Sequence, residues 1–376
     1  MSKINARSPY LLYYTDELLN NVIVNLKIWS GSSSNVPAEY TQVLASTAIN
    51  KEVTMDISQI VRSYIDDVFN GVYEIDVKFC KIEYFMYDVD GNVIETSSVI
   101  NDIYEGYSYF EEGTNAGLND LVMMSNNVIV TNDHYPIRIP ILAQSSGFVT
   151  LEYYSKGVLE YTDVKYLGGG SSTDKVQYST NSIGDIDVFT SGVIQDGGVV
   201  ESPDCVEEVY DSYYSNMDVD YINVSYAGEI VETIQVKEIE ECKYNTYKVI
   251  FKNKYGVWQD LWFFKRADVS LKTKSEEYTS NVITGGSYDI NRHQYNTFAK
   301  NGRETIKLNS GFYPEAYNEV FRQLQLSEQV YLDYEDKVLP VNIKDGDFVF
   351  KTSLNEKMIN YTVTLDFSFN KINNIR

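Results

Sequence analysis

The sequence predicts a mainly β protein made of two or three antiparallel β-sandwich or barrel-like domains with a few accessory helices. Three observations support this fold class. Apolar residues recur with a period of two in most segments, tyrosine occurs 33 times, and proline occurs only 7 times in 376 residues. A period of two is typical of strands buried on one face, and tyrosine is favoured in strands and at protein interfaces.

The strand prediction is clearest near the N-terminus. Residues 22–29 alternate, and their apolar face consists of Val22, Val24, Leu26 and Ile28. Residues 72–87 alternate as well, without indicating which face is buried. The Asp-Gly pair within residues 88–93 predicts a hairpin turn after this second strand. Cys80, which lies in the second strand, is interpreted as a small buried hydrophobe.

Two segments carry the spacing of helices instead. Residues 57–70 follow Asp56, a typical N-cap, and stop before Gly71, so we expect a helix that seals one end of a sandwich. Residues 314–326 begin with a proline, which is favoured in the first turn of a helix. The apolar stripe of this second helix consists of Tyr317, Val320, Phe321 and Leu324.

Charge and loop composition suggest three units. We expect an N-terminal β-sandwich at 1–135, an acidic middle β-domain at 136–236 and a near-neutral β-domain at 237–376, with a hairpin at 253–256 and a final strand at 361–369. The first 236 residues hold 11 Lys and Arg against 35 Asp and Glu, a net of −24, whereas the rest hold 20 against 19, a net of +1. We interpret the acidic part as solvated and the neutral part as the assembly domain. A compositional drift without function is the alternative.

The overall charge excludes some classes of partner. A net charge of −23 argues against nucleic acid and against an anionic membrane surface. The chain has no run of 18 apolar residues, and its first residues lack the apolar core of a secretory signal, so we expect no membrane span and no export. The isolated Cys80, Cys205 and Cys242 suggest neither a disulfide framework nor a zinc site.

Motifs for catalysis or cofactor binding are weak. Residues 88–92 begin like a calcium loop, but the glycine falls at the fourth position and no glutamate follows at the twelfth. The glycines at 168–170 lack the lysine of a phosphate loop. His134 and His293 are the only histidines, and no Gly-x-Ser-x-Gly nucleophile motif accompanies them. A glycosidase needs only two carboxylates, so it stays open as a minor alternative. We expect no enzyme activity, no metal and no cofactor.

Several stretches resemble uncharacterised tail-region structural proteins of tailed bacteriophages, especially those that infect Bacteroidetes. The likeness is carried by both ends of the chain and is weakest across the middle. The stretches are 5–10 (NARSPY), 247–251 (YKVIF), 258–266 (WQDLWFFKR), 308–315 (LNSGFYPE), 326–332 (LSEQVYL), 339–345 (LPVNIKD) and 354–362 (LNEKMINYT). The resemblance implies assembly into a virion and no catalysis.

The expected function is therefore a structural component of the virion, at the tail tip or baseplate, that forms an oligomeric ring or sleeve through its C-terminal domain. A neck, collar or capsid decoration protein is the alternative position. Its partners would be other copies and other virion proteins, brought together in the host cytoplasm and released by lysis. The candidate assembly contacts are Trp258, Trp262, Phe264, Phe312, Tyr313 and Tyr331.

A second class of function stays open at this point. A receptor-binding or glycan-binding module would use exposed tyrosines beside acidic residues as a stacking platform. The candidate surface residues for this alternative are Tyr153, Tyr154, Tyr213 and Tyr214.

Overall fold

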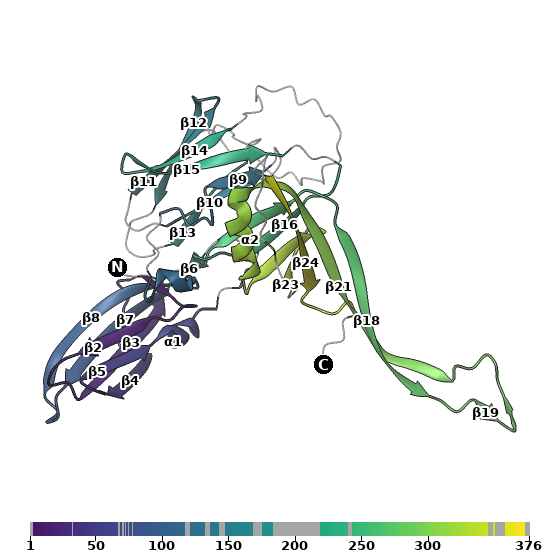
Figure 1. Cartoon of the computed structure of the whole chain (residues 1–376), viewed down its shortest axis with the longest axis horizontal. Helices are drawn as coiled ribbons and strands as arrows, with labels where there is room; N and C mark the ends of the chain where they lie inside the picture. Colours follow the sequence, from purple (N-terminus) through teal and green to yellow (C-terminus); the bar gives the residue numbers. More distant parts are fainter. Residues whose placement is uncertain are drawn as a thin grey trace. The chain divides into compact units, whose positions relative to one another are not determined.

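The computed structural model describes residues 3–31, 33–66, 68–69, 71, 73, 75–76, 78–116, 121–131, 136–142, 147–167, 175–182, 219–239, 243–344, 349 and 358–372. The chain is mainly β with few helices, which confirms the predicted fold class (Figure 1). It forms two compact units. Unit 1 comprises Met1–Cys242, Phe251–Asp260 and Ala316–Ser327, and unit 2 comprises Lys243–Ile250, Leu261–Glu315 and Glu328–Arg376.

The first part of unit 1 is a five-stranded sheet covered by a small second layer. The order is β1-β8-β7-β3-β4, and only the β1–β8 pair is parallel. The strands are β1 (Lys3–Asn5), β3 (Asn21–Ser30), β4 (Gln42–Thr47), β7 (Lys78–Tyr87) and β8 (Val93–Tyr104). The second layer contains the pair β2 (Leu11–Thr15) and β5 (Glu52–Asp56) with helix α1 (Ser58–Arg62).

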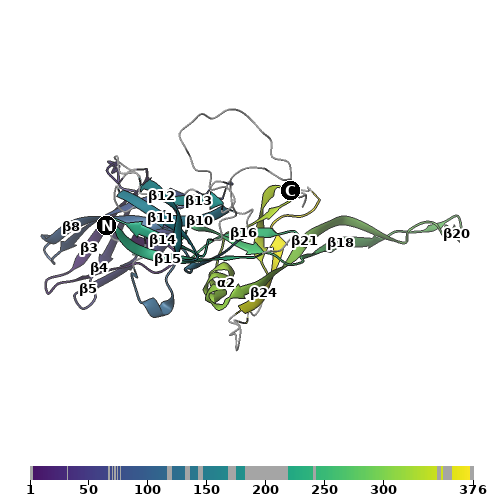
Figure 2. The ribbon, with the colours of Figure 1, turned by 90° about the horizontal axis from the view of Figure 1, so that it is seen from above.

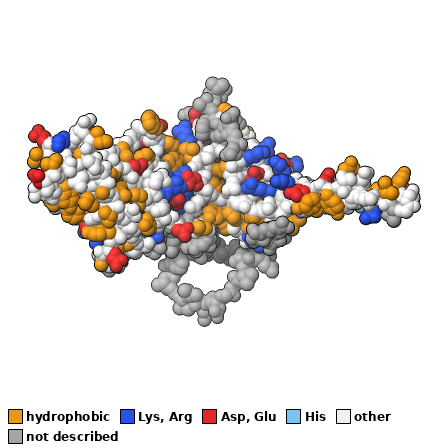
Figure 3. Space-filling view, turned by 90° about the horizontal axis from the view of Figure 1, so that it is seen from below, with side chains coloured by type: hydrophobic (Ala, Val, Ile, Leu, Met, Phe, Trp, Pro, Cys, Tyr) orange, Lys and Arg blue, Asp and Glu red, His pale blue; other side chains and the backbone are white. Residues whose placement is uncertain are grey.

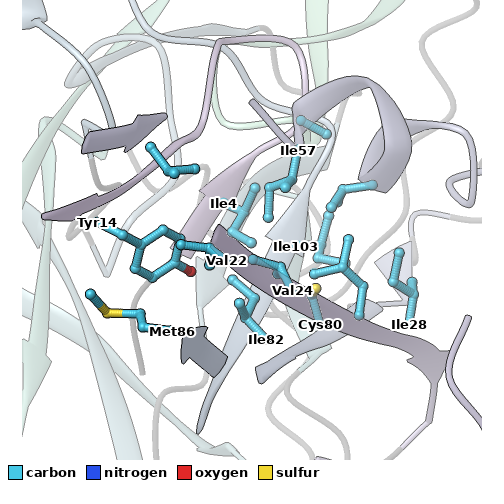
Figure 4. Packing of buried hydrophobic residues seen from close by; sticks show 14 of the residues in the cluster. Ile4, Tyr14, Val22, Val24, Ile28, Ile57, Cys80, Ile82, Met86 and Ile103 are labelled. Atoms are coloured by element: carbon cyan, nitrogen blue, oxygen red, sulfur yellow. The ribbon is translucent and has the colours of Figure 1, made fainter. Parts of the chain in front are cut away.

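The core between these layers contains the apolar face that periodicity predicted for residues 22–29 (Figure 4). The predicted face of β3 is buried throughout, and Cys80 on β7 is fully buried beside it. The predicted turn joins β7 to β8. In it the Asp88 carboxylate accepts hydrogen bonds from the amides of Asp90 and Asn92, at 2.9 and 2.8 Å. The Asn92 side chain donates a further hydrogen bond to Asp88, which has the largest effect on its pKa. Together these bonds lower the pKa of the Asp88 carboxyl.

Helix α1 is shorter than predicted, ending at Arg62 and not at residue 70. Asp56 does accept a hydrogen bond from the Ser58 amide, at 2.9 Å, so the predicted start is close to the observed one. Val61 is fully buried, whereas Tyr64 and Val68 are largely exposed. Because Tyr64 and Val68 find no core and Ile65 is only partly buried, little burial stabilises further turns of an otherwise marginal short helix.

A second five-stranded sheet in unit 1 has the order β12-β11-β14-β15-β9. Its strands are β9 (Val128–Thr131), β11 (Gly147–Ser155), β12 (Val158–Leu167), β14 (Tyr221–Tyr226) and β15 (Glu229–Glu238). A three-stranded sheet, β10-β13-β6, contains β6 (Ile75–Asp76), β10 (Pro136–Leu142) and β13 (Lys175–Ser182). Since β6 pairs with β13, the predicted boundary near residue 135 does not separate compact units.

Unit 1 also takes up two segments that we assigned to the C-terminal domain. One is the predicted hairpin turn at 253–256, and the other is α2 (Asn318–Gln325), which follows the 3₁₀ turn η2 (Glu315–Tyr317). The predicted apolar stripe of this helix is buried. Two hydrogen bonds explain the assignment: the Tyr317 hydroxyl accepts from the Val130 amide at 2.6 Å, and the Gln323 side-chain oxygen accepts from the Lys254 amide at 2.9 Å.

Unit 2 is built on a seven-stranded sheet with the order β17-β16-β22-β23-β24-β21-β18, although residues 251–252 of β16 and 258–260 of β17 are assigned to unit 1. Its strands are β16 (Tyr247–Lys252), β17 (Trp258–Phe263), β18 (Asp268–Thr279), β21 (Tyr295–Pro314), β22 (Val330–Tyr334), β23 (Lys337–Ile343) and β24 (Met358–Phe367). The predicted final strand is β24, whose alternate residues from Ile359 to Phe367 are buried. A two-stranded ribbon completes the unit, with β19 (Ile283–Thr284) and β20 (Ser287–Tyr288).

Candidate assembly surface

The most exposed element of unit 2 is a long hairpin, here called the arm and defined as residues 268–301. It contains β18, β19, β20 and the first part of β21, and it continues beyond the sheet as a ribbon of two strands (Figures 1 and 2). Every residue of β18 is exposed. The register runs from Asp268 opposite Lys307 to Thr279 opposite Tyr295. Among the strands that the structure describes, β21 alone is hydrogen-bonded to β18.

The arm arises because β21 has two different halves. In the C-terminal half, Ile306 and Leu308 are fully buried and lie opposite Leu365 and Val363 of β24. The pairing with β24 ends at Thr305, and the N-terminal half has β18 alone beside it. The same strand is therefore core at one end and solvent-exposed ribbon at the other.

Local sequence explains the turn at the tip of the arm. Gly285 and Gly286 both have positive φ angles, of 64° and 81°, and lie between the paired strands β19 and β20. Two adjacent residues with positive φ form the hairpin turn whose twist matches the flanking strands, and glycine adopts it without steric cost.

Apolar side chains are exposed along the whole arm, as the space-filling view shows (Figure 3). They are Val269, Leu271, Tyr278, Ile283, Tyr288, Ile290, Tyr295 and Phe298. Tyr278 and Phe298 contact each other edge to face across the two strands, with ring centroids 5.8 Å apart. A two-stranded hairpin alone in water is marginally stable, and contiguous exposed apolar side chains mark interaction sites. The arm therefore has the chemistry of a surface that is covered in an assembly.

The charge of the arm fits the same interpretation. Residues 268–301 hold four Lys and Arg and four Asp and Glu, a net of zero in a chain of net charge −23. Copies of a strongly acidic protein repel one another, so a contact between copies is favoured where the charge is balanced.

Four of the six predicted assembly contacts are wrong, because they are core residues of the chain itself. Trp262, Phe264 and Tyr313 are buried within unit 2, where the Tyr313 hydroxyl donates to the Trp262 carbonyl at 2.5 Å. Trp258 is buried in unit 1 against Phe69, with ring centroids 5.1 Å apart.

The other two predicted contacts are accessible. Phe312 is 60% exposed and Tyr331 is partly exposed, both in unit 2. Large aromatic residues are frequent both in cores and in interfaces, so their presence in the sequence could not separate the two environments.

The tyrosines proposed for glycan binding do not form the expected platform. Tyr153 is buried on the inner face of β11. Tyr154 points to the opposite face and stacks on Tyr221 of β14, with ring centroids 4.7 Å apart and planes at 9°, so one of its faces is already covered. Tyr213 and Tyr214 lie outside the described residues, as do His134, Cys205, Cys242, the glycines at 168–170 and residues 354–357.

The residues considered for metal binding and catalysis do not gather into a metal site in the described part of the chain. Within those residues no group of three or more His, Cys, Asp and Glu is placed to hold a metal ion. His293 is exposed on the arm, where its backbone carbonyl accepts a hydrogen bond from the Ser280 hydroxyl at 3.2 Å. Among the helices that the structure describes, none has the length and hydrophobicity needed to cross a membrane.

Sequence reasoning missed the arm, although one signal for it was present. The Gly285-Gly286 pair between two alternating segments is a hairpin signal of the usual kind. Polar residues alternate with apolar ones on both sides of it, which is also the pattern of a strand buried on one face.

Comparison with protein-family models gave no match, and comparison with curated proteins gave none.

Proposed function

We propose that this protein is a non-enzymatic structural component of a tailed-phage virion, located at the tail tip or baseplate, and that it assembles into an oligomeric ring or sleeve through unit 2. The observation that supports the proposal best is the arm. It is a long β-ribbon with apolar side chains, no net charge and every residue of β18 exposed. Such a ribbon can hold subunits together in an assembly, because a second chain can pair with its strands and cover its apolar side chains.

The position in the particle follows from the resemblance of both chain ends to tail-region proteins. The proposal therefore has two separable parts, self-association through the arm and residence in the tail. The structure bears on the first part alone, and the second needs its own experiment.

Self-association is tested by shortening the arm. Residues 276–299 are replaced by an Asn-Gly turn, so that Lys274 stays opposite Asn301 and Ser275 adjoins the new turn. The removed residues are nearly all exposed, so unit 2 keeps its core. Light scattering after gel filtration should give a multimer for the wild-type chain and a monomer for the variant.

A matched control removes apolar surface elsewhere. Val158 and Val164 on β12 are also exposed, and their replacement by serine should leave the multimer intact. A wild-type chain that stays monomeric at every concentration contradicts the first part of the proposal. For the second part, mass spectrometry of purified particles should detect the chain, and cryo-electron microscopy should place it in the tail; absence from particles contradicts the virion assignment.

A further inference from the structure

The outer edge of β18 in the arm is an open strand edge. β18 is the last strand of the seven-stranded sheet, and all 12 of its residues are exposed. An open edge presents backbone amide and carbonyl groups that another strand can bind, and soluble proteins usually protect such edges. The edge of β18 can therefore accept a strand, and its charged side chains determine which strand fits.

β18 keeps the spacing of a regular strand along this edge. Its register with β21 shifts between Lys274 and Glu276, where β18 has one intervening residue and β21 has two, Ala299 and Lys300. Ala299 has a positive φ of 48°. An extra residue bends the strand that contains it, so the irregularity belongs to β21. The even-numbered side chains of β18 thus share one face and the odd-numbered ones the other.

We propose that the β18 strands of two copies pair antiparallel about a two-fold axis at Ser275, so that the two arms join in one sheet. The inference rests on the proposed self-association and specifies its contact. The two-fold axis is perpendicular to the sheet, so each face continues into the same face of the second copy. Residues that lie opposite each other are then both even-numbered or both odd-numbered.

The charges of β18 complement themselves about this axis. The strand carries Asp268, Lys272, Lys274, Glu276 and Glu277. With the axis at Ser275, Lys274 of each copy lies opposite Glu276 of the other, which gives two pairs of opposite charge. Such cross-strand pairs stabilise a sheet.

The other three charges of β18 meet no like charge across the axis. Lys272 lies opposite Tyr278, whose ring attracts a cation. Glu277 lies opposite the neutral Thr273. Asp268 lies outside the overlap, which covers residues 271–279 of both strands, and it forms an ion pair with Arg266 at 3.2 Å.

Other registers oppose like charges. The 12 residues of β18 allow an overlap of nine or more residues only where the axis lies at residue 272, 273, 274 or 275. An axis at 272 places Lys272 opposite itself, one at 273 places Lys272 opposite Lys274, and one at 274 places Lys274 opposite itself. Like charges directly opposite each other are destabilising. Charge therefore selects a second copy of β18 in the register centred on Ser275.

The charges of β21 lie one strand further from the contact. Arg303 is opposite Lys272 and Glu304 is opposite Leu271 on β18 of the same chain. Because strands are about 4.8 Å apart, these charges are about 10 Å from the partner's β18. That distance is about one Debye length at physiological ionic strength, so their effect is largely screened. A two-fold contact joins copies in pairs, and assemblies built through it contain an even number of copies.

The first test exchanges the two opposed charges in the full-length chain. Lys274→Glu places carboxylates opposite each other at two positions, and Glu276→Lys places ammonium groups there. Each variant alone should associate at least about tenfold more weakly than the wild-type chain in light scattering. Mixed in equal amounts, the two variants oppose unlike charges again, so association should return to within about threefold of the wild type.

The matched control is Lys300→Glu, the same charge change at an exposed lysine on the other strand of the arm, which should assemble like the wild-type chain. If the two single variants assemble like the wild type, or if their mixture stays dissociated, the β18 pairing is overturned. Arm-mediated assembly still stands in that case if the shortened arm gives a monomer. If the chain with the shortened arm assembles like the wild type, the proposed function and this inference both fail.

The second test measures the register without changing a charge. In a chain with Cys205→Ser and Cys242→Ser, the variant Ser275→Cys places two thiols at the axis. Opposed Cα atoms in an antiparallel pair are about 4.5–5.5 Å apart, which is within the range for a disulfide. Oxidation should therefore give a cross-linked dimer on a non-reducing gel. Thr273→Cys in the same background should give none, because position 273 lies about 13 Å along the strand from its counterpart. Equal cross-linking from both positions, or none from Ser275→Cys, overturns the inference.

Discussion

Asn253 offers the sharpest test of how unit 1 is held together. Its side chain is fully buried in the turn between β16 and β17 and makes four hydrogen bonds. The amide group donates to the Met123 carbonyl at 2.8 Å and to the Gln259 side-chain oxygen at 3.0 Å. The oxygen accepts from the amides of Tyr255 and Val257, at 3.0 and 3.3 Å. The side chain thus joins the hairpin turn to a segment 130 residues away in the sequence.

The structure gives the size of the effect of Asn253→Ala. The substitution removes the bonds to the Met123 carbonyl and the Val257 amide, both of which are buried. Leaving a buried backbone group unsatisfied costs about 1–3 kcal/mol, so two such groups cost about 2–6 kcal/mol. Since total stabilities are about 5–15 kcal/mol, we expect a large fall in the free energy of unfolding of unit 1.

The assay is equilibrium unfolding in urea, followed by far-ultraviolet circular dichroism and by the fluorescence of the tryptophans, including Trp258 in unit 1. The matched control is Asn281→Ala. Its side-chain oxygen accepts from the Ile283 amide at 2.9 Å, the same two-residue spacing as Asn253 to Tyr255, but on the exposed arm. Surface substitutions of this kind cost about 0.5 kcal/mol or less. Similar losses for the two variants would refute the reasoning that burial sets the cost.

Two further outcomes are expected. Tyr317→Phe leaves the buried Val130 amide without its partner and should destabilise unit 1 by about 1–3 kcal/mol in the same urea assay. The control Tyr13→Phe, at an exposed site, should change the free energy of unfolding little. A Tyr317→Phe variant as stable as the wild type would contradict the role of this hydroxyl. Burial raises the pKa of the Cys80 thiol to about 12, so at pH 8 only about one thiol in ten thousand is ionised. Since iodoacetamide reacts with the thiolate, it should modify Cys80 in urea but not in the native protein. Peptide mass spectrometry measures the modification. Modification of native Cys80 at the unfolded rate would contradict its burial.

The candidate site was harder to predict than the fold, and Trp262 and Phe312 show why. Both are aromatic residues in strands of unit 2, yet Trp262 is buried and Phe312 is exposed. Alternation separates the two faces of one strand and does not say which face is covered by the rest of the chain. The arm makes a related point, because β21 is one continuous strand while only its C-terminal part is paired with β24.

The sequence by itself determined the local features: the strand of Val22 to Ile28, the turns at 88–93 and 253–256, the stripe on α2 and the mainly β class. These depend on side-chain periodicity and on turn residues, which act over a few positions. Only the tertiary structure decided that α2 and the turn at Asn253 belong to unit 1, and that residues 268–301 form an exposed arm. The first outcome depends on contacts between residues more than a hundred positions apart, such as Tyr317 with Val130, and the second depends on where the pairing of β21 with β24 ends. No local pattern encodes which distant segment will supply the partner.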